Sequence, residues 1–163
     1  MLPFTVCPVG DTGLLVSFEQ RIAQSVGAAV AALNTRVAAA AIPGVVETVP
    51  AFASLLIFYD PLVTEYDAVA AAVQKLVQVP DSDTAAEEGR LVEIPVCYGG
   101  TFGPDLPSVA EHAGLTEKEV IELHAGREYR IYMLGFLPGF PYLGGLDERL
   151  FTPRLASPRT AIP

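Results

Sequence analysis

The stretch VVETVPAFASLLIFYD, residues 45–60, decides the fold of the first half of the chain. Residues 45–49 and 55–59 are rich in β-branched and aromatic side chains, which favour strands, and a short connection separates them. Upstream, residues 4–9 and 14–18 have the same character around a turn that contains Gly10, Asp11 and Gly13. We therefore expect two pairs of strands in this half.

Segments of helical periodicity follow each strand pair. Apolar residues recur at three- and four-residue steps at Ile22, Val26, Ala29, Val30, Leu33 and Val37, until Pro43 and Gly44 end the pattern. A second set follows Thr64, which we expect to cap its helix, and comprises Tyr66, Val69, Ala70, Val73, Leu76 and Val77. The order ββαββα predicts an α+β domain in which two helices cover one face of an antiparallel sheet.

A change of composition separates the two halves of the chain. Residues 80–90, PDSDTAAEEGR, replace the apolar periodicity with acids, Pro, Ser, Thr and Gly, a composition typical of a linker. The sequence therefore predicts an α+β domain over residues 1–80, an acidic linker over residues 81–90 and a second domain over residues 91–163.

The second domain begins and continues with β-type segments. Residues 91–97 and residues 129–134 favour strands, and glycines follow the first of these in the turn-rich residues 98–104. Residues 135–146, GFLPGFPYLGGL, contain so much Gly and Pro that we expect no regular element there.

Two short helices are predicted between these segments. Asp105 is a candidate cap for the first helix, which Gly114 ends. Thr116 and Glu119 have the spacing of a capping box, which opens a second helix that reaches His124.

Composition excludes several classes of protein. Hydrophobic residues make up 51% of the chain, so its apolar content is too high for an intrinsically disordered segment. Ten Lys and Arg against 19 Asp and Glu give a net charge of −9, which argues against binding to nucleic acids or anionic membranes. The start of the chain lacks the features of a signal peptide, and Asn34, Arg36 and Pro43 interrupt its most apolar stretch. We expect a cytoplasmic protein that binds other proteins or small molecules.

The cysteines and histidines show no motif. Cys7 and Cys97 lie far apart, without the spacing of a zinc site, and we interpret both as buried thiols in a reducing compartment. His112 and His124 have no partner at metal-ligand or catalytic spacing. Because His124 precedes Ala-Gly at a predicted helix end, its expected role is to stabilise that end. No metal site is predicted.

The Gly- and Pro-rich residues 135–146 are the strongest candidate for a site. Proline steps stiffen this segment, and glycines leave backbone N–H groups uncovered by side chains. Phe136, Phe140 and Tyr142 then form an apolar wall beside accessible amides, which suits a peptide or a small acyl ligand. The alternative is that these aromatic residues only fill the core beneath an irregular connection.

Arginines follow this segment at Arg149, Arg154 and Arg159. A guanidinium binds a carboxylate or phosphate through two parallel hydrogen bonds, so a cluster of arginines beside an aromatic loop suits an anionic substrate. The alternative is that they are solvated and pair with surface acids. Residues 99–103, GGTFG, resemble a phosphate-binding loop only in their glycine content, since the GK[ST] signature is missing.

Long motifs in the second half resemble the KipI family. They are YGGTFGPDL, AGLTEKEVIELH, YMLGFLPGFPYLGGL and TPRLASPRT, within a match that runs from Glu93 to Pro163. Members of this family are described as the B subunit of 5-oxoprolinase (PxpB) or as allophanate hydrolase subunit 1, with a carboxyltransferase-type domain. Residues 1–90 agree with the family's N-terminal α+β domain in length and pattern.

The resemblance implies that residues 91–163 start a cyclophilin-like β-barrel domain. Members of the family usually continue beyond the position of Pro163 with several more strands. Since a barrel must close to remove unpaired strand edges, we expect a fragment, or an open edge that pairs with a second copy or with another subunit.

The resemblance also implies a function. Members work with a KipA/PxpC-type subunit and a PxpA-type subunit in the ATP-dependent conversion of 5-oxoproline to glutamate. We expect this chain to bind no cofactor, with ATP on a partner subunit, and to be inactive alone. The alternatives are a regulatory module that inhibits a sensor histidine kinase, and a subunit of the allophanate hydrolase or urea amidolyase type.

No residue is predicted as a catalyst. The expected contribution of this chain is part of a shared substrate pocket, in which the aromatic segment supplies shape and backbone amides and arginines bind the substrate carboxylate. The predicted pocket residues are Phe136, Pro138, Gly139, Phe140, Tyr142, Arg154 and Arg159.

Overall fold

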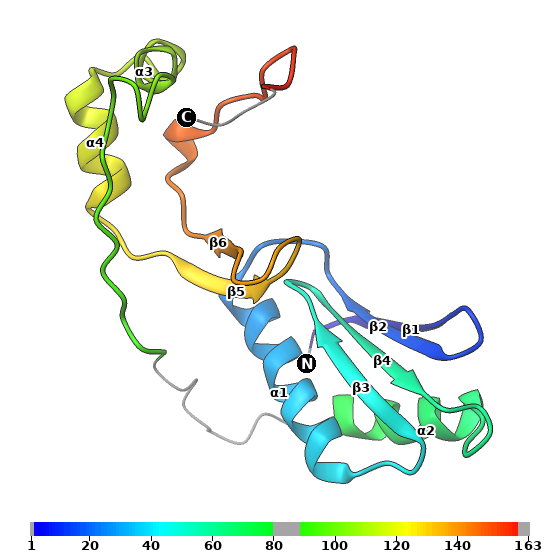
Figure 1. The fold of residues 1–163 in the computed structure, drawn as a ribbon. Helices are drawn as coiled ribbons and strands as arrows, with labels where there is room; N and C mark the ends of the chain where they lie inside the picture. The colour runs from blue at the N-terminus through cyan, green and yellow to red at the C-terminus, as the bar shows by residue number, and fades with distance from the viewer. Residues whose placement is uncertain (1, 80–88, 160–163) are drawn as a thin grey trace. The chain divides into compact units, whose positions relative to one another are not determined.

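The computed structural model describes residues 2–79 and 89–159 (Figure 1). Contacts divide the chain into two compact units. The first unit contains the residues before the gap together with Ile131–Tyr142, and the second contains Gly89–Arg130 and the residues from Leu143 onward. Of the predicted linker, only Gly89 and Arg90 are among the described residues.

The first unit is built on an antiparallel sheet of four strands in the order β1-β2-β4-β3. The strands are β1 (Phe4–Val9), β2 (Gly13–Phe18), β3 (Val45–Pro50) and β4 (Ser54–Tyr59). At the centre, β2 pairs with β4, so that Leu14 lies opposite Ile57 and Val16 opposite Leu55. This arrangement confirms the predicted antiparallel sheet.

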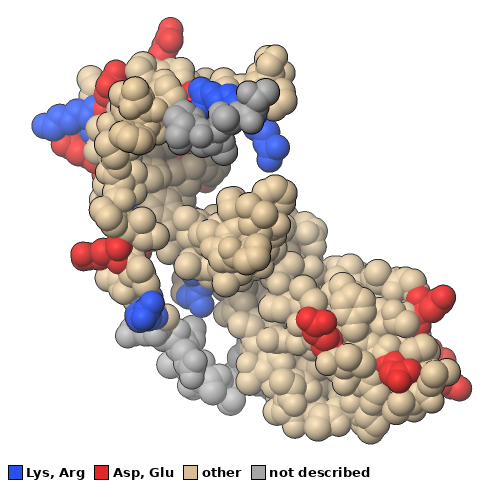
Figure 2. All heavy atoms as spheres, in the orientation of Figure 1, with Lys and Arg blue, Asp and Glu red and all other residues tan. Residues whose placement is uncertain are grey.

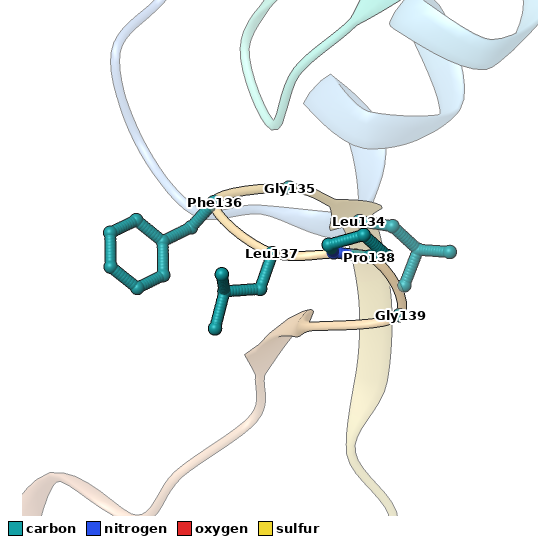
Figure 3. Close-up of a pocket in the computed structure, with 6 residues that line it drawn as sticks. All are labelled: Leu134, Gly135, Phe136, Leu137, Pro138 and Gly139. Carbon is teal, nitrogen blue, oxygen red and sulfur yellow. The ribbon is translucent and has the colours of Figure 1, made fainter.

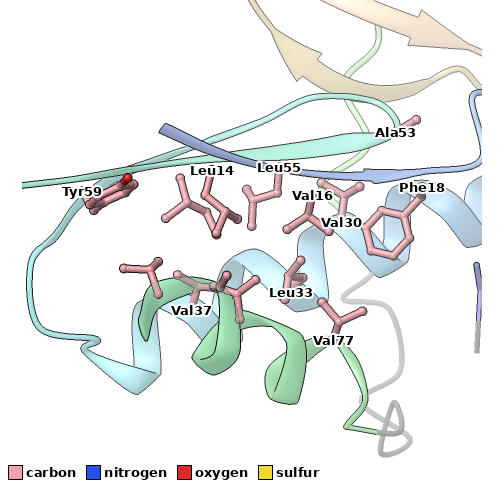
Figure 4. Packing of buried hydrophobic residues seen from close by; sticks show 14 of the residues in the cluster. Leu14, Val16, Phe18, Val30, Leu33, Val37, Ala53, Leu55, Tyr59 and Val77 are labelled. Carbon is pink, nitrogen blue, oxygen red and sulfur yellow. The ribbon is translucent and has the colours of Figure 1, made fainter. Parts of the chain in front are cut away.

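Two helices cover one face of this sheet. Helix α1 (Gln24–Ala40) and helix α2 (Tyr66–Val77) bury the faces that their apolar periodicity predicted. Figure 4 shows side chains of this core between the sheet and the two helices. Alternate residues of β2 and β4 point into the core, as expected for a sheet with one covered face. The largest fully buried residues are Leu14, Val16, Val26, Leu33, Val37, Leu55, Ile57, Val69 and Val73.

Two expectations for the helices are wrong in detail. Ile22 precedes α1 and is 65% exposed, because the helix starts only at Gln24. Thr64 does not cap α2; the N-cap is Glu65, without a side-chain cap. The backbone N–H of Thr64 instead donates to the carbonyl of Asp60, and the Thr64 side chain lies so close to Gly44 that a Cβ there would be 2.5 Å from the Thr64 Cγ2.

Cys7, in the outer strand β1, is not buried as expected. Phe4 and Val6 of β1 pack against the core, so Cys7, between Val6 and Pro8, lies on the opposite face and is exposed. The prediction of a buried thiol at this position is therefore wrong. Both edge strands contain a proline, Pro8 in β1 and Pro50 in β3.

The second unit contains two short helices, α3 (Leu106–Ala113) and α4 (Glu117–Ala125), and a 3-10 turn, η1 (Glu148–Leu150). Its small core consists of Ala110, Val120 and Leu150. Both predicted helix signals are confirmed. Gly114 ends α3 in a left-handed conformation, with φ of 66°, and Thr116 and Glu119 form the complete capping box of α4.

Other expectations for the second unit are corrected. Residues 91–97 are not in a strand, because no described residue pairs with them, and Cys97 is exposed. Asp105 is the N-cap residue of α3, but its side chain does not cap the helix. Closure into a cyclophilin-like barrel stays a prediction.

A hairpin of β5 (Arg130–Leu134) and β6 (Pro141–Gly144) contains the candidate segment. Strand β5 confirms the predicted strand, whereas β6 contradicts the expectation that residues 135–146 hold no regular element. Tyr132 of β5 lies against α1, where a Cβ built at Gly27 would be 2.8 Å from the Tyr132 ring. Glycine at this position therefore lets the hairpin approach the helix.

Figure 2 shows one face of the molecule, on which uncharged residues cover most of the area between separate acidic and basic side chains. Among the described residues, no helix has the length and apolarity that crossing a membrane requires.

Candidate functional site

The candidate segment is a tight, stiff turn between β5 and β6. The Gly135 N–H donates to the Phe140 carbonyl at 3.1 Å, and the Phe140 N–H donates to the Leu137 carbonyl at 3.0 Å. Phe136 and Gly139 both have a positive φ, 66° and 78°. A positive φ is unfavourable for a residue with a bulky side chain, so the turn holds Phe136 in a strained conformation.

Aromatic rings form a continuous row along this hairpin. The Phe136 and Phe140 rings are 5.8 Å apart and the Phe140 and Tyr142 rings 5.5 Å apart, each pair edge to face at 71°. Such pairs are favourable because the edge of one ring meets the electron-rich face of the next. Phe136 is 83% exposed, so the row is a surface feature, and the alternative that these rings only fill the core is wrong for this residue.

The turn borders a shallow cavity of about 340 Å³ that is widely open to solvent and is lined by residues 134–139. Figure 3 shows that the side chains of Phe136 and Leu137 extend to the same side of the turn. Among the described residues, none accepts a hydrogen bond from the backbone N–H of Phe136 or Gly139. The turn can therefore offer two backbone donors beside apolar side chains to a ligand with an acceptor oxygen.

The structure brings together five of the predicted pocket residues and places the two arginines elsewhere in the chain. Phe136, Pro138, Gly139, Phe140 and Tyr142 share the hairpin of the first unit, whereas Arg154 and Arg159 belong to the second unit. The Arg159 guanidinium forms a two-pronged ion pair with Asp105, with Nη1 donating to Oδ2 at 2.6 Å. This pair holds the pKa of the Asp105 carboxyl below its usual range. The assignment of the seven residues to one substrate pocket stays a prediction.

Sequence reasoning missed a second cavity, of about 410 Å³, which lies entirely in the second unit. Its polar lining includes Tyr98, His124 and the Asp105–Arg159 pair. Most of the rest is apolar and comes from Val96, Phe102, Leu106, Val109, Val120, Leu146 and Leu150.

Two tyrosines hold His124 at the edge of this cavity. The Tyr98 hydroxyl is 2.6 Å from His124 Nδ1, and the Tyr129 hydroxyl donates to the His124 carbonyl at 2.9 Å. The Tyr98 ring meets the imidazole edge to face. Burial raises the pKa of both tyrosines above the ordinary value for a phenol.

The prediction that His124 only stabilises a helix end omits this contact. The two members of the pair lie in two of the quoted motifs, Tyr98 in YGGTFGPDL and His124 in AGLTEKEVIELH, 26 residues apart. Spacing alone has no signal for a contact made through the fold. The described residues contain no cluster of three or more His, Cys, Asp or Glu side chains arranged to hold a metal ion.

Comparison with known proteins shows a consistent set of relatives. The chain matches the family described as "Carboxyltransferase domain, subdomain C and D" over residues 4–163. It is 39% identical to the B subunit of 5-oxoprolinase from Bacillus subtilis (strain 168) over 165 residues, which cover 95% of this chain and 68% of the relative. It is 47% identical to the B subunit of 5-oxoprolinase from Escherichia coli O157:H7 over 123 residues, covering 74% of this chain but 55% of the relative.

Solved structures agree with this result. The crystal structure of TTHA0988 is 35% identical with a TM-score of 0.72, over 90% of this chain and 28% of that chain. Kluyveromyces lactis urea carboxylase shares the fold, with a TM-score of 0.62 at 14% identity, over 86% of this chain and 14% of that chain. The resemblance stated from the motifs is confirmed, and the chain spans only part of the length of these proteins.

Proposed function

Because the chain belongs to the carboxyltransferase-domain family, subdomains C and D, and is similar to the B subunit of 5-oxoprolinase, we propose that it is a subunit of an ATP-dependent 5-oxoprolinase. The observation that supports this most strongly is the 39% identity to the Bacillus subtilis relative over 95% of this chain. In this proposal the complex converts 5-oxoproline to glutamate, and the chain acts with a KipA/PxpC-type subunit and a PxpA-type subunit.

The chemistry of the substrate suggests how the work is divided. The 5-oxoproline ring is a lactam, whose carbonyl carbon resists attack by water because the nitrogen donates electrons to it. Phosphorylation of the carbonyl oxygen by ATP makes the carbon electrophilic. Water then adds to this carbon and the C–N bond breaks, which opens the ring to the acyl phosphate of glutamate. A second water hydrolyses the acyl phosphate and releases phosphate and glutamate. We assign ATP to a partner subunit and part of the substrate pocket to this chain.

The hairpin turn is the proposed contribution of the first unit to that pocket. The N–H groups of Phe136 and Gly139 suit the carbonyl oxygen of the acyl phosphate, which gains negative charge when the second water adds. The aromatic row of Phe136, Phe140 and Tyr142 suits the apolar edge of the substrate ring. Arg154 and Arg159 are the proposed partners of the substrate carboxylate, which would replace Asp105 on the Arg159 guanidinium.

The test is reconstitution of the complex from the chain, a KipA/PxpC-type subunit and a PxpA-type subunit. We expect glutamate release from 5-oxoproline that depends on ATP and on all the components. Tyr142→Ala and Arg154→Ala should each lower this turnover about tenfold or more, as removal of binding contacts does. Phe151→Ala is the matched control, since Phe151 is 59% exposed and belongs to neither cavity.

Three results would contradict the proposal. Turnover that is unchanged in both variants would remove the pocket assignment, and absence of glutamate from the reconstituted complex would remove the activity. Release of ammonia from allophanate by the same preparation would assign the chain to an allophanate hydrolase instead.

A further inference from the structure

We propose that the cavity bounded by Tyr98 and His124 is a second binding site, which takes a small carboxylate or carboxamide by its carbonyl oxygen. The site is separate from the hairpin turn, and all of its residues belong to the second unit. The proposal does not rest on 5-oxoprolinase activity, since it concerns binding by this chain alone.

The contact with Tyr98 occupies Nδ1 of His124 and leaves Nε2 as the other ring nitrogen. A phenol keeps its proton at neutral pH, because its ordinary pKa is about 10. When the Tyr98 hydroxyl donates to Nδ1 across 2.6 Å, the neutral imidazole carries its own proton on Nε2. Among the described residues, none forms a hydrogen bond with Nε2. With Tyr98 as the donor, which is the assignment that the proposal makes, the ring has an unused N–H donor at the edge of the cavity.

Several contacts hold this donor in place. The Tyr129 hydroxyl binds the carbonyl of His124, the last-but-one residue of α4. The rings of Tyr98 and Tyr129 lie 5.7 and 5.3 Å from the imidazole centre. A donor that is already oriented loses little conformational freedom when a ligand binds.

The rest of the cavity determines the class of ligand. Its volume of about 410 Å³ is ample for a small molecule, and its walls are mainly the side chains of Val96, Phe102, Leu106, Val109, Val120 and Leu150. Such walls suit a hydrocarbon body. Asp105 is the one carboxylate among the lining residues, and Arg159 already neutralises it, so the lining does not favour a cation.

The Asp105–Arg159 pair selects neither a charged nor a neutral ligand. Asp105 and Arg159 both border the cavity and neutralise each other, so the cavity has little net preference for a carboxylate over an amide. Both groups present the carbonyl oxygen that the imidazole N–H requires. Probes that share the same hydrocarbon group but differ in their polar group distinguish a carboxylate ligand from an amide ligand.

The experiment follows the imidazole NMR signals of the 163-residue chain, which contains only two histidines. The probes are isovalerate, isovaleramide and isopentylamine, which share a branched hydrocarbon part. We expect the His124 signals to shift with isovalerate, isovaleramide or both, with a Kd on the order of 1 mM for molecules of this size. Exposed His112, on α3, is the internal control and should not shift.

Variants separate this site from adventitious contact. Tyr98→Phe keeps the ring but removes the hydroxyl that binds Nδ1. We therefore expect the Nε2–H tautomer of His124 to be no longer favoured over the Nδ1–H tautomer, and the Kd to rise about three- to tenfold. Phe102→Ser removes an exposed part of the wall and should weaken binding as well. Phe151→Ser, which alters an exposed phenylalanine outside the cavity, should leave the Kd unchanged.

Three results would overturn the proposal. The first is that the His124 signals do not shift with isovalerate or isovaleramide at concentrations well above the expected Kd. The second is that the His112 and His124 signals shift equally. The third is that isopentylamine shifts the His124 signals as much as the carbonyl probes do. Because no partner and no turnover enter this test, its failure leaves the proposed function standing, and failure of the reconstituted complex leaves this site standing.

Discussion

The two terminal guanidinium nitrogens of Arg159 both bind the Asp105 carboxylate, although the two residues are 54 positions apart in the chain. Asp105 belongs to the YGGTFGPDL motif and Arg159 to TPRLASPRT. The pair therefore links two motifs of the second unit at the start of α3, where sequence reasoning expected Asp105 to act only as a helix cap.

This pair predicts a specific change in the titration of Asp105. The hydrogen bonds from Arg159 lower the pKa of Asp105 in the folded chain, so the pair stabilises the fold above the unfolded pKa of about 3.9. That contribution is lost as the pH falls through the lower, folded pKa.

We expect Arg159→Gln to raise the pKa of Asp105 toward its ordinary value. The measurement is the ¹³C shift of the Asp105 carboxyl as a function of pH. Arg154→Gln is the control and should not alter this titration, since Arg154 forms no ion pair with a described residue. An Asp105 titration that is identical in the chain and in Arg159→Gln would show that the pair does not form in solution.

A second prediction concerns the contact between Gly27 and Tyr132. In the interior of a helix, alanine is favoured over glycine by about 1 kcal/mol. At Gly27, however, the new Cβ would be 2.8 Å from the Tyr132 ring, so we expect Gly27→Ala to lower the free energy of unfolding. In a Tyr132→Ala background the ring is gone, and the same substitution should stabilise the chain by about 0.5–1 kcal/mol.

Urea unfolding of the four chains measures this coupling as a double-mutant cycle. A change of sign between the two backgrounds is the expected result. If Gly27→Ala stabilises both backgrounds equally, the β5–β6 hairpin does not pack on α1.

The capping box of α4 gives a third prediction. Thr116 accepts from the Glu119 N–H at 3.2 Å, and Glu119 in return accepts from the Thr116 N–H at 2.7 Å. Thr116→Ala should lower the free energy of unfolding by about 1 kcal/mol. Thr116→Ser keeps a side-chain hydroxyl and should retain most of the stabilisation that the cap provides. Amide hydrogen exchange in α4 shows whether the loss is local. Exposed Thr101 is the control position, and equal effects of Ala and Ser at Thr116 would contradict a capping role.

The exposed cysteines give a fourth prediction. Cys7 and Cys97 are both exposed and form no disulfide in the structure. A thiol reagent such as DTNB should therefore label both without denaturant, and Cys7→Ser and Cys97→Ser should each leave a single reactive thiol. Labelling that requires urea would restore the interpretation of buried thiols.

Local patterns predicted most of the secondary structure. The helices α1 and α2 follow from apolar residues at helical spacing, and α4 follows from the side chains of Thr116 and Glu119, which lie within one turn. These signals act over a few residues, so neighbouring sequence contains them completely.

Three of the errors have different physical causes. Cys7 is exposed because alternate residues of β1 face opposite sides of the sheet, a signal that the alternation of Phe4 and Val6 already held. Strand β6 was missed because Pro141 is its first residue, one of the positions at which a strand accepts proline. The contact of Tyr98 with His124 depends on the path of the chain between them.

The prolines in the outer strands bear on how the chain behaves when it is concentrated. A strand from a neighbouring molecule can form hydrogen bonds with the unpaired edge of a sheet, and fibrils grow by repeated pairing of this kind. A strand that arrives beside β1 or β3 meets Pro8 or Pro50, each of which lacks an amide hydrogen. Replacement of Pro8 and Pro50 would remove an obstacle to such pairing at both edges of the sheet.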